Sequence, residues 1–495
     1  MLQGKRETLR TYLLGTVAVL SAGPAFAQAD APRLGAPSQP APTTERTVVQ
    51  QNDRPAIGPG ALDGQLAQPG GTTRDSDTLD LPDPQSVLDG VPAERSAGVD
   101  RGVAVTARRR PAYDPIGVRL GAYTLQASAA TTLGYDSNVF SQTDGVSDAY
   151  ASLRAAALLR SDYSRHLVEL EAYADQRLFA SFGTENALTY AATARGRYDI
   201  GALDSLTVNL TREHQIIERG AVGEVLRTRR PVRYDLTGAG LSGRKIFGRV
   251  TVDLSGQVSD FDYDNARNPA GALVDQDFRD FLLYETRADF GYASGGAITL
   301  FGSVTGEARR FRINAPPINR DSDLIEVLGG VRGEITPLLR GQFGLGYIFV
   351  DLKDPNFKSR GGLGINVSLQ YLVTELTTVQ ASGRRRLQNV GSAIAPASLT
   401  TELRVGVDHE LLRNLIVSAG AGYQNADFVD NGQLATRQPA TRLSFDLGAR
   451  YLINRRFRLG ADIDFRRRDG GGAFVDDLSR NFERVRASVS IIVAL

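Results

Sequence analysis

RVTVDLSGQVS, residues 249–259, is the stretch that decides the fold. Its apolar side chains, among them Val250, Val252 and Leu254, stand at alternate positions, and polar side chains fill the positions between them. Alternate side chains of a β-strand point to opposite faces, so the pattern predicts a strand with one apolar and one polar face. The same alternation recurs in SLTVNLTRE (205–213), GLGINVSLQYL (362–372) and FRLGADIDFRRR (457–468). We therefore expect an all-β chain from Val118 to Leu495.

The connections between the expected strands alternate in length. Short connections lie near Ser164, Leu203, Phe247, Gly295, Leu338, Glu375, Arg413 and Asn454. Long polar connections lie near 139–148, 182–187, 217–231, 263–276, 312–321, 352–359, 388–398, 426–438 and 468–479. An up-and-down meander with this rhythm has every tight turn at one end and every long loop at the other. The spacing predicts an antiparallel up-and-down sheet of about 18 strands, the even number expected when both termini lie on one side.

Two architectures could use such strands. A soluble sandwich buries the apolar faces in a core, whereas a membrane barrel turns them toward lipid and keeps the polar faces inside. Charged side chains on the polar faces, such as Glu169, Glu171 and Arg177, have no role in a soluble core. We therefore predict a transmembrane β-barrel over residues 116–495. Tyrosines near the segment ends suit its two interfacial girdles: Tyr123, Tyr135, Tyr150, Tyr163, Tyr284, Tyr292, Tyr347, Tyr371, Tyr423 and Tyr451.

The chain finishes on an expected strand, RVRASVSIIVAL (484–495), whose apolar face runs from Val485 to Leu495. Such an end resembles the assembly signal of outer-membrane barrels, although those usually end in Phe and this chain ends in Leu. The expected partners are therefore the barrel-assembly machinery, outer-membrane lipid and lipopolysaccharide, and the expected location is the outer membrane of a Gram-negative cell.

A barrel of about 16 to 18 strands is too wide for side chains to fill, so an aqueous lumen is expected unless a loop or the N-terminal segment plugs it. The alternation assigns charges of both signs to its wall. Opposed charges across a pore favour polar, hydrated solutes; equally, they are what water-facing strand positions carry in any case. The candidate lumen-lining residues are Glu169, Glu171, Asp175, Arg177, Asp253, Arg384, Arg386, Arg458, Asp462 and Asp464.

The N-terminal part has a different composition. Residues 1–27 combine Lys5, Arg6 and Arg10, a short apolar run and an Ala-Phe-Ala cleavage site, which predicts a secretory signal peptide. Residues 28–115 are rich in Pro, Ala and Gly and poor in aromatic residues, so we expect a disordered periplasmic linker. The basic run ARRR (107–110) is expected at the periplasmic interface, beside anionic headgroups.

Composition argues against several functions. The formal net charge is +1, which gives no support to nucleic-acid binding. Cysteine is absent and there are 3 histidines, His166, His214 and His409, so neither a disulfide nor a transition-metal site is expected. No G-x-S-x-G motif occurs, and no nucleophile, base and orienting group can be placed together. We expect no enzymatic activity, no cofactor and no bound metal.

Two acidic stretches bear on calcium. DSNVF (136–140) and DFDYDNARNPAG (260–271) each lack ligands that an EF-hand-like loop requires, although loose binding of a hard cation at the rim stays an alternative. Asp260 and Asp262 continue the parity of the lipid-facing Val252 and Leu254. The strand must therefore have left the hydrocarbon, or bulged, before Asp260.

VRLGAYTLQASAATTLGYDSNVF (118–140), a glycine-containing first strand that runs into Gly134–Phe140, resembles the start of the putative beta-barrel porin 2 family of Gram-negative outer membranes. The resemblance would cover about residues 118–495 and is sharp only at Gly134–Phe140. It implies a porin, and relatives in that family are often associated with secretion of exopolysaccharide. We expect Tyr135 in the outer girdle and Asp136 and Asn138 at the lumen rim.

The leading hypothesis is an aqueous conduit for export of an exopolysaccharide, with the polymer and periplasmic export components as partners. Two alternatives stay open: a general or solute-selective diffusion porin, and a surface adhesion or structural protein whose loops do the work. A fold does not fix a function, and the sequence does not name the solute.

Overall fold

The computed structural model describes residues 103–201, 203–221, 224, 228–313, 319–389, 397–428, 439–470 and 481–495. The predicted signal peptide (1–27) and residues 28–102 of the predicted linker lie outside these residues. No helix among the described residues is long and apolar enough to cross a membrane.

The described residues form strands and two short 3-10 turns, η1 (Gly183–Glu185) and η2 (Asp277–Arg279). The period-two alternation is the reason, since each strand presents one apolar and one polar face. In chain order the strands are β1 (Val118–Leu120), β2 (Tyr123–Asp136), β3 (Asp148–Ser161), β4 (Leu167–Phe179), β5 (Ala187–Asp199), β6 (Ser205–Ile216), β7 (Arg233–Phe247), β8 (Val250–Tyr263), β9 (Ala266–Arg267), β10 (Leu273–Val274), β11 (Phe281–Ala293), β12 (Ile298–Phe311), β13 (Ser322–Thr336), β14 (Leu339–Leu352), β15 (Arg360–Thr374), β16 (Thr377–Asn389), β17 (Ala397–Leu412), β18 (Leu415–Phe428), β19 (Ala440–Leu452), β20 (Phe457–Gly470) and β21 (Phe482–Ala494).

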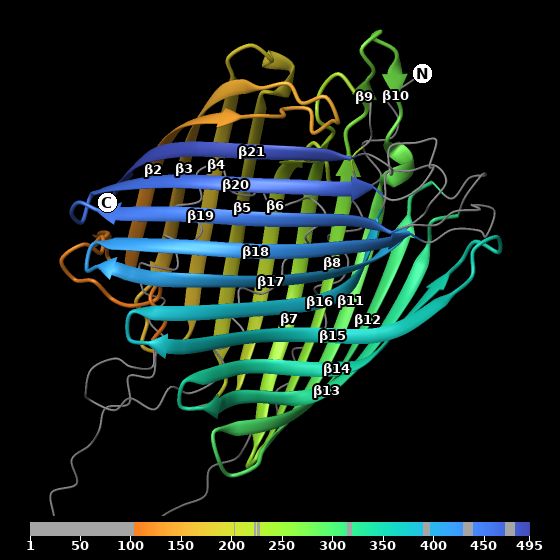
Figure 1. The fold of residues 1–495 in the computed structure, drawn as a ribbon. Coiled ribbons are helices and arrows are strands. Elements are labelled where there is room, and N and C mark those ends of the chain that lie inside the picture. The colour runs from red at the N-terminus through yellow and green to blue at the C-terminus, as the bar shows by residue number, and fades with distance from the viewer. Residues whose placement is uncertain are drawn as a thin grey trace, which may run out of the picture. The chain divides into compact units, whose positions relative to one another are not determined.

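Each strand of the main sheet pairs antiparallel with its neighbour in sequence, and β8 pairs with β11 past the small β9–β10 hairpin. The last strand, β21, returns to pair with β2 from Asp136↔Arg486 to Ser128↔Ala494, which closes the barrel. The closed barrel consists of β2–β8 and β11–β21, which are 18 strands, and β1 pairs with β2 alone among the described strands (Figure 1). The predicted all-β, up-and-down barrel of about 18 strands is confirmed.

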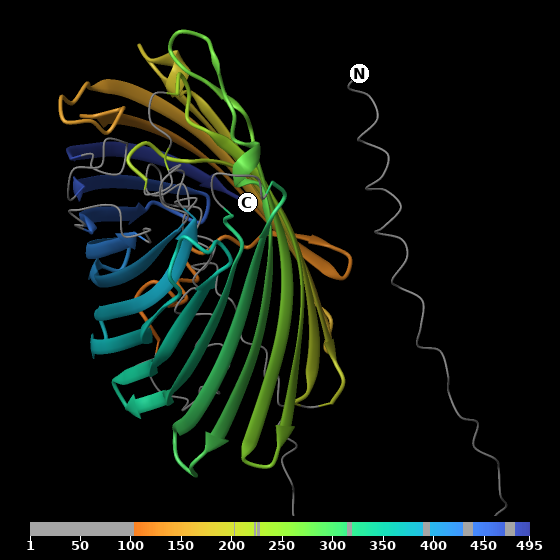
Figure 2. The same ribbon diagram turned by 90° about the vertical axis from the view of Figure 1, so that its right-hand side faces the viewer.

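The two ends of the barrel differ as the connection lengths predicted. Tight turns such as that between β7 and β8 lie at one end, which we call the short-turn end, together with Leu495 (Figure 1). The long connections, the β9–β10 hairpin among them, lie at the other, which we call the long-loop end (Figures 1 and 2).

The outer face carries the apolar side chains and two aromatic belts. On β8, Val250, Leu254 and Val258 are exposed on the outer face, whereas Asp253 points inward and pairs with Arg244. Outer aromatic side chains at the long-loop end are Tyr135, Tyr190, Tyr284, Tyr347 and Tyr423, and those at the short-turn end are Tyr198, Phe247, Tyr292, Tyr371, Tyr451 and Phe457.

Tyr150 was expected in a girdle, and this expectation is wrong. Its side chain is 5 % exposed and packs on the inner face against Val139 and Phe179. Gly134, its direct partner on β2, makes the room, because a Cβ there would lie 2.3 Å from Tyr150 Cζ. Position near a strand end suggested a girdle residue, but strand parity decides the face.

β8 does not bulge before Asp260, so the alternative that stays is a strand that has left the hydrocarbon there. The β7–β8 register continues without a shift through Asp260 and Asp262 to Tyr263. Arg312, in the next long connection, lies 2.6 Å from an Asp260 carboxylate oxygen and 3.6 Å from one of Asp262. An outward-facing ion cluster of this kind belongs beyond the apolar belt.

The ends of β16 and β17 fold into the lumen at the long-loop end. Pairing of β16 with β15 stops at Asn366↔Arg384, although both strands continue beyond that point. Leu387 and Leu399, on the face that would otherwise meet lipid, pack in one buried cluster with inward-facing side chains that include Ile348. Arg309, on the inner face of β12, donates to the Leu387 carbonyl at 2.8 Å.

Candidate transport path

The ten charged residues predicted for the lumen wall all lie on the inner face. On β4, Glu169, Glu171, Asp175 and Arg177 alternate with the exposed Leu170 and Leu178. Asp253 points inward from β8 and lies 2.6 Å from Arg244. Whether these groups act in transport stays a prediction. The other five are Arg384 and Arg386 on β16 and Arg458, Asp462 and Asp464 on β20.

Part of the lumen is a cavity of about 890 Å³. Many of its charges pair across neighbouring strands or along one strand, as Arg244 does with Asp253 and Arg287 with Asp289. Its lining includes the arginines 197, 244, 287, 309, 332, 384, 385, 386 and 404 and the acidic residues Asp253, Glu285, Asp289, Glu307 and Glu326. A wall of this composition is wetted and suits polar cargo.

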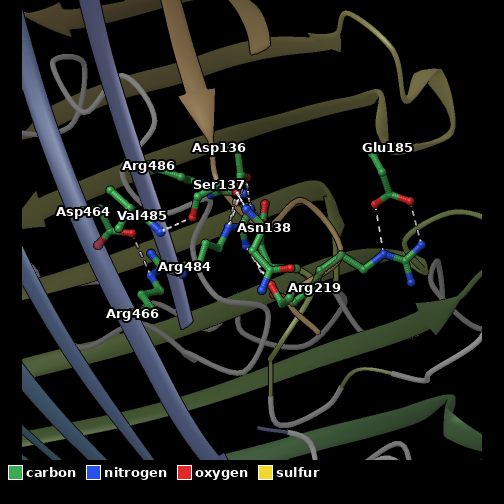
Figure 3. A network of polar contacts seen from close by, with 12 residues as sticks. Asp136, Ser137, Asn138, Glu185, Arg219, Asp464, Arg466, Arg484, Val485 and Arg486 are labelled. Atoms are coloured by element: carbon green, nitrogen blue, oxygen red, sulfur yellow. Dashed lines mark hydrogen bonds and ion pairs between the residues drawn. The ribbon is translucent and has the colours of Figure 1, made fainter. Parts of the chain in front are cut away.

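A buried ion network sits at the long-loop end, around Asp136 at the end of β2 (Figure 3). The Asp136 side chain is 0 % exposed and accepts hydrogen bonds from Arg484 Nε at 3.0 Å and Arg486 Nε at 2.9 Å. Arg486 continues to Glu218 at 3.2 Å, and Arg177 meets the other oxygen of Glu218 at 2.7 Å. Three arginines from β4 and β21 therefore share two buried carboxylates.

Glu218 belongs to the long β6–β7 connection, which crosses the lumen. We call residues Ile217–Ala221 the crossing segment. β6 is separated from β21 by β2, β3, β4 and β5, yet the crossing segment reaches side chains of β19, β20 and β21. The strands β19–β21 stand five to seven places round the barrel from β6, so the segment bridges part of the mouth.

Main-chain and side-chain contacts hold the crossing segment. The Gly220 carbonyl accepts from Arg442 Nη2 at 2.5 Å and Arg468 Nη1 at 3.2 Å. Arg219 donates hydrogen bonds to the Glu185 carboxylate from Nε at 2.9 Å and from Nη2 at 2.8 Å (Figure 3). Burial lowers the pKa of Arg219, but its bonds to Glu185 and Glu224 outweigh burial and raise the pKa, so the guanidinium stays charged.

The short-turn end holds residues Val103–Asp114, which we call the docked segment. Ala104 and Val105 are buried, and the Val105 amide donates to Thr378 Oγ1 on the inner face of β16 at 3.0 Å. The Pro111 carbonyl accepts from Arg455 in the β19–β20 turn at 2.9 Å. The last part of the predicted 28–115 linker is thus packed inside the barrel mouth.

The basic run at 107–110 was expected beside lipid headgroups, and the structure places it elsewhere. Arg108 Nη1 and Arg110 Nη2 both approach Glu410 Oε2, at 3.2 Å and 2.8 Å, and Glu410 points into the lumen from β17. Arg109 alone of the three arginines is exposed. Two arginines of this run therefore bind a carboxylate on the inner wall instead of lipid headgroups.

The residues of the predicted rim motif lie at the long-loop end of the barrel. Tyr135 is 50 % exposed on the outer face at the long-loop end. Asn138 is buried; its side-chain amide donates to the carbonyls of Gln142 at 2.6 Å and Glu483 at 2.9 Å, which ties the first loop to β21. Asp136 does more than line a rim, because it is the centre of the ion network.

The residues that sequence reasoning missed are Arg484, Arg486 and Glu218. A signal for the two arginines existed, because the alternation that assigns Val485 to lipid also assigns Arg484 and Arg486 to the inner face. No comparable pattern marks Glu218, whose place depends on the path of a long loop.

Comparison with known proteins gives a family and weak structural likenesses. No curated protein matches the chain. A mutant of the ferric enterobactin receptor PfeA from Pseudomonas aeruginosa aligns with a TM-score of 0.39 and 9% identity, covering 74% of this chain and 80% of that chain. The siderophore receptor PirA from Acinetobacter baumannii aligns with a TM-score of 0.39 and 7% identity, covering 74% of this chain and 80% of that chain. The copper transporter OprC aligns with a TM-score of 0.41 and 11% identity, covering 76% of this chain and 81% of that chain.

The family assignment depends on the sequence and not on these structures, because identity and TM-score are both low. The model of the family described as "Putative beta-barrel porin 2" matches residues 110–493, which is nearly the whole described barrel. The chain, a porin-like β-barrel of the outer-membrane type, therefore belongs to the putative beta-barrel porin 2 family.

Proposed function

We propose that the barrel exports an exopolysaccharide through its lumen across the outer membrane of a Gram-negative cell. The short-turn end then faces the periplasm and the long-loop end faces outward, as in bacterial outer-membrane barrels. A polar, charged wall suits a hydrated polymer, because hydroxyl groups can exchange bonds to water for bonds to the wall.

The observation that carries the proposal is the pair of segments docked in the two mouths of a polar lumen. The crossing segment is held by Arg442 on β19 and Arg468 on β20, and the docked segment is held by Glu410. A general diffusion porin works as a permanently open path. Occupied mouths fit better with a path that opens for a particular cargo, and this favours export over free diffusion.

The expected partners follow from the orientation. The docked segment lies at the mouth that faces the periplasm in this orientation, where a periplasmic export component can reach it. Barrel-assembly machinery and lipopolysaccharide are the partners that the membrane location adds.

Deletion of the gene tests the function. Export predicts loss of surface polymer with unchanged uptake of small solutes, and restoration of polymer by the wild-type chain. A diffusion porin predicts the reverse, slower solute uptake with normal polymer. If trimming the 217–231 loop abolishes attachment while polymer and solute uptake both stay normal, the adhesion alternative replaces the proposal.

A further inference from the structure

Four arginines meet in the lumen where β16 leaves β15: Arg309, Arg384, Arg385 and Arg386, which we call the arginine cluster. All four line the 890 Å³ cavity. Arg384 and Arg386 point inward by strand parity, and Arg309 approaches from β12 to donate to the Leu387 carbonyl at 2.8 Å.

Arg385 joins them only because β16 has separated from β15. Strand parity would turn its side chain toward lipid, yet it lines the cavity. Its Nη1 lies 3.0 Å from where a Cβ of Gly362 on β15 would stand, so the glycine leaves space for the guanidinium. Three consecutive arginines thus serve one cavity, which an ordinary paired strand does not allow.

The carboxylates near the cluster do not balance its charge. Glu402 accepts from both Arg384 at 3.1 Å and Arg386 at 2.9 Å, and Glu307 lies 3.4 Å from Arg309. Among the described residues Arg385 forms no ion pair. Among the described residues, Glu402 therefore serves two of these arginines and Glu307 one, whereas Arg385 has no carboxylate partner.

Buried donors of the cluster also lack acceptors. Arg309 Nε, Arg385 Nε and both Nε and Nη1 of Arg386 have no hydrogen-bond partner among the described residues. Arg309 is 4 % exposed and Arg386 is 9 % exposed, so bulk water is largely excluded. Unsatisfied buried donors are costly, and an oxyanion is the acceptor that matches the fork of a guanidinium group.

We propose that the arginine cluster binds acidic sugar units, through their carboxylate groups, as the polymer passes. This proposal rests on the proposed export function and adds the substrate class, a polyuronate-like polysaccharide. The cavity volume falls in the range of roughly 300–1,000 Å³ that encloses small ligands, which gives room for a short stretch of polymer.

Binding of oligogalacturonate to the purified full-length protein tests the proposal, with neutral maltoheptaose as the uncharged probe. We expect oligogalacturonate alone to bind, more weakly as salt rises. The Arg385→Gln plus Arg386→Gln variant should lose about tenfold or more in affinity. The Arg385→Lys plus Arg386→Lys variant, which keeps the charge but loses the planar fork, should fall between.

Arg467→Gln is the matched control, because Arg467 lies on the outer face of β20 and pairs with Asp469 at 3.3 Å. It should bind as the wild type does. Equal binding of both oligosaccharides, or wild-type affinity in the double glutamine variant, would overturn the proposal. Competition by inorganic phosphate as strong as by oligogalacturonate would also overturn it, because the site would then accept any oxyanion.

The two levels of the proposal fail in different ways. If the double glutamine variant folds, as circular dichroism can check, and exports normal amounts of polymer, the cluster has no role and the conduit stands. If the gene deletion leaves surface polymer unchanged, the export function itself is wrong, whatever the purified protein binds.

Discussion

The ion pairs at the two mouths of the barrel differ in how deeply their side chains are buried. At the long-loop end Asp136 is 0 % exposed, and Arg484 and Arg486 beside it are nearly as deeply buried. At the short-turn end a single carboxylate, Glu410, holds both Arg108 and Arg110, and the Arg108 side chain is 19% exposed.

This difference bears on which mouth can open. Removing one partner from a buried ion network leaves uncompensated charge, whereas a pair with a partly exposed member, such as Arg108 with Glu410, can exchange with water at smaller cost. We infer that the crossing segment is a fixed constriction and that the docked segment is the part that can leave. In the proposed orientation, cargo from the periplasm would meet this end first.

The largest effect is expected at the long-loop end. Asp136→Asn should lower the free energy of unfolding by about 3–5 kcal/mol, because Arg484 and Arg486 lose their shared carboxylate. Guanidinium titration of the folded barrel measures it. Asp469→Asn, which removes an exposed partner of Arg467, is the control and should cost about 0–1 kcal/mol. Equal costs for the two variants would mean that burial does not distinguish the networks.

Displacing the crossing segment should widen the mouth. Gly220→Ala adds a Cβ about 2.5 Å from Phe482 Cζ at a residue with φ +83°, so the segment must shift. We expect higher single-channel conductance in planar bilayers. Gly248→Ala shares the positive φ, +62°, but meets nothing within 4 Å, and it should leave conductance unchanged. A rise in both variants would point to general loosening of the barrel.

Neutralising the carboxylate of Glu410 should be enough to release the docked segment. Glu410→Gln removes the partner of Arg108 and Arg110, so protease should cleave within 103–114 several times faster than in the wild type. Arg109→Gln is the control, because Arg109 is exposed. If Glu410→Gln stays as resistant as the control, contacts such as that of Val105 with Thr378 suffice to hold the segment.

The smallest effect we expect is the difference between removing Arg108 and removing Arg110 from the docked segment. Arg110→Gln should release the segment more than Arg108→Gln does, because Arg110 is the more buried of the two and is 2.8 Å from Glu410 against 3.2 Å. The expected difference is about 0.5–1 kcal/mol. Amide exchange of the Val105 N–H reports it, and the reverse order would assign the main contact to Arg108.

The two-residue alternation of the sequence predicted which side chains face the lumen. It did not predict features that depend on how long loops and strand ends run through space. Alternation assigned Asp253 and Arg177 to the inner face and the connection lengths assigned the two ends, because both are local properties of a strand meander. Leu387 and Leu399 carry the parity of lipid-facing residues, so nothing local marks the infolded ends of β16 and β17.

The candidate site was predicted in part for the same reason. Asp136 was singled out from its motif, but Glu218, which shares Arg486 with it, comes from a long loop that no periodicity governs. The docked segment lies in a stretch of low apolar content, which favoured a disordered linker over the packing of Val105 against the barrel.

The proposed export function requires that the lumen conducts and that the docked segment can leave its short-turn end. The chain has no cysteine, so the Val105→Cys plus Thr378→Cys variant carries a single pair, at positions joined by a 3.0 Å hydrogen bond. Single-channel conductance of this variant in planar bilayers is measured before and after reduction. We expect low conductance with the disulfide formed and a rise on reduction. The same conductance in both states, with the disulfide confirmed, would contradict it.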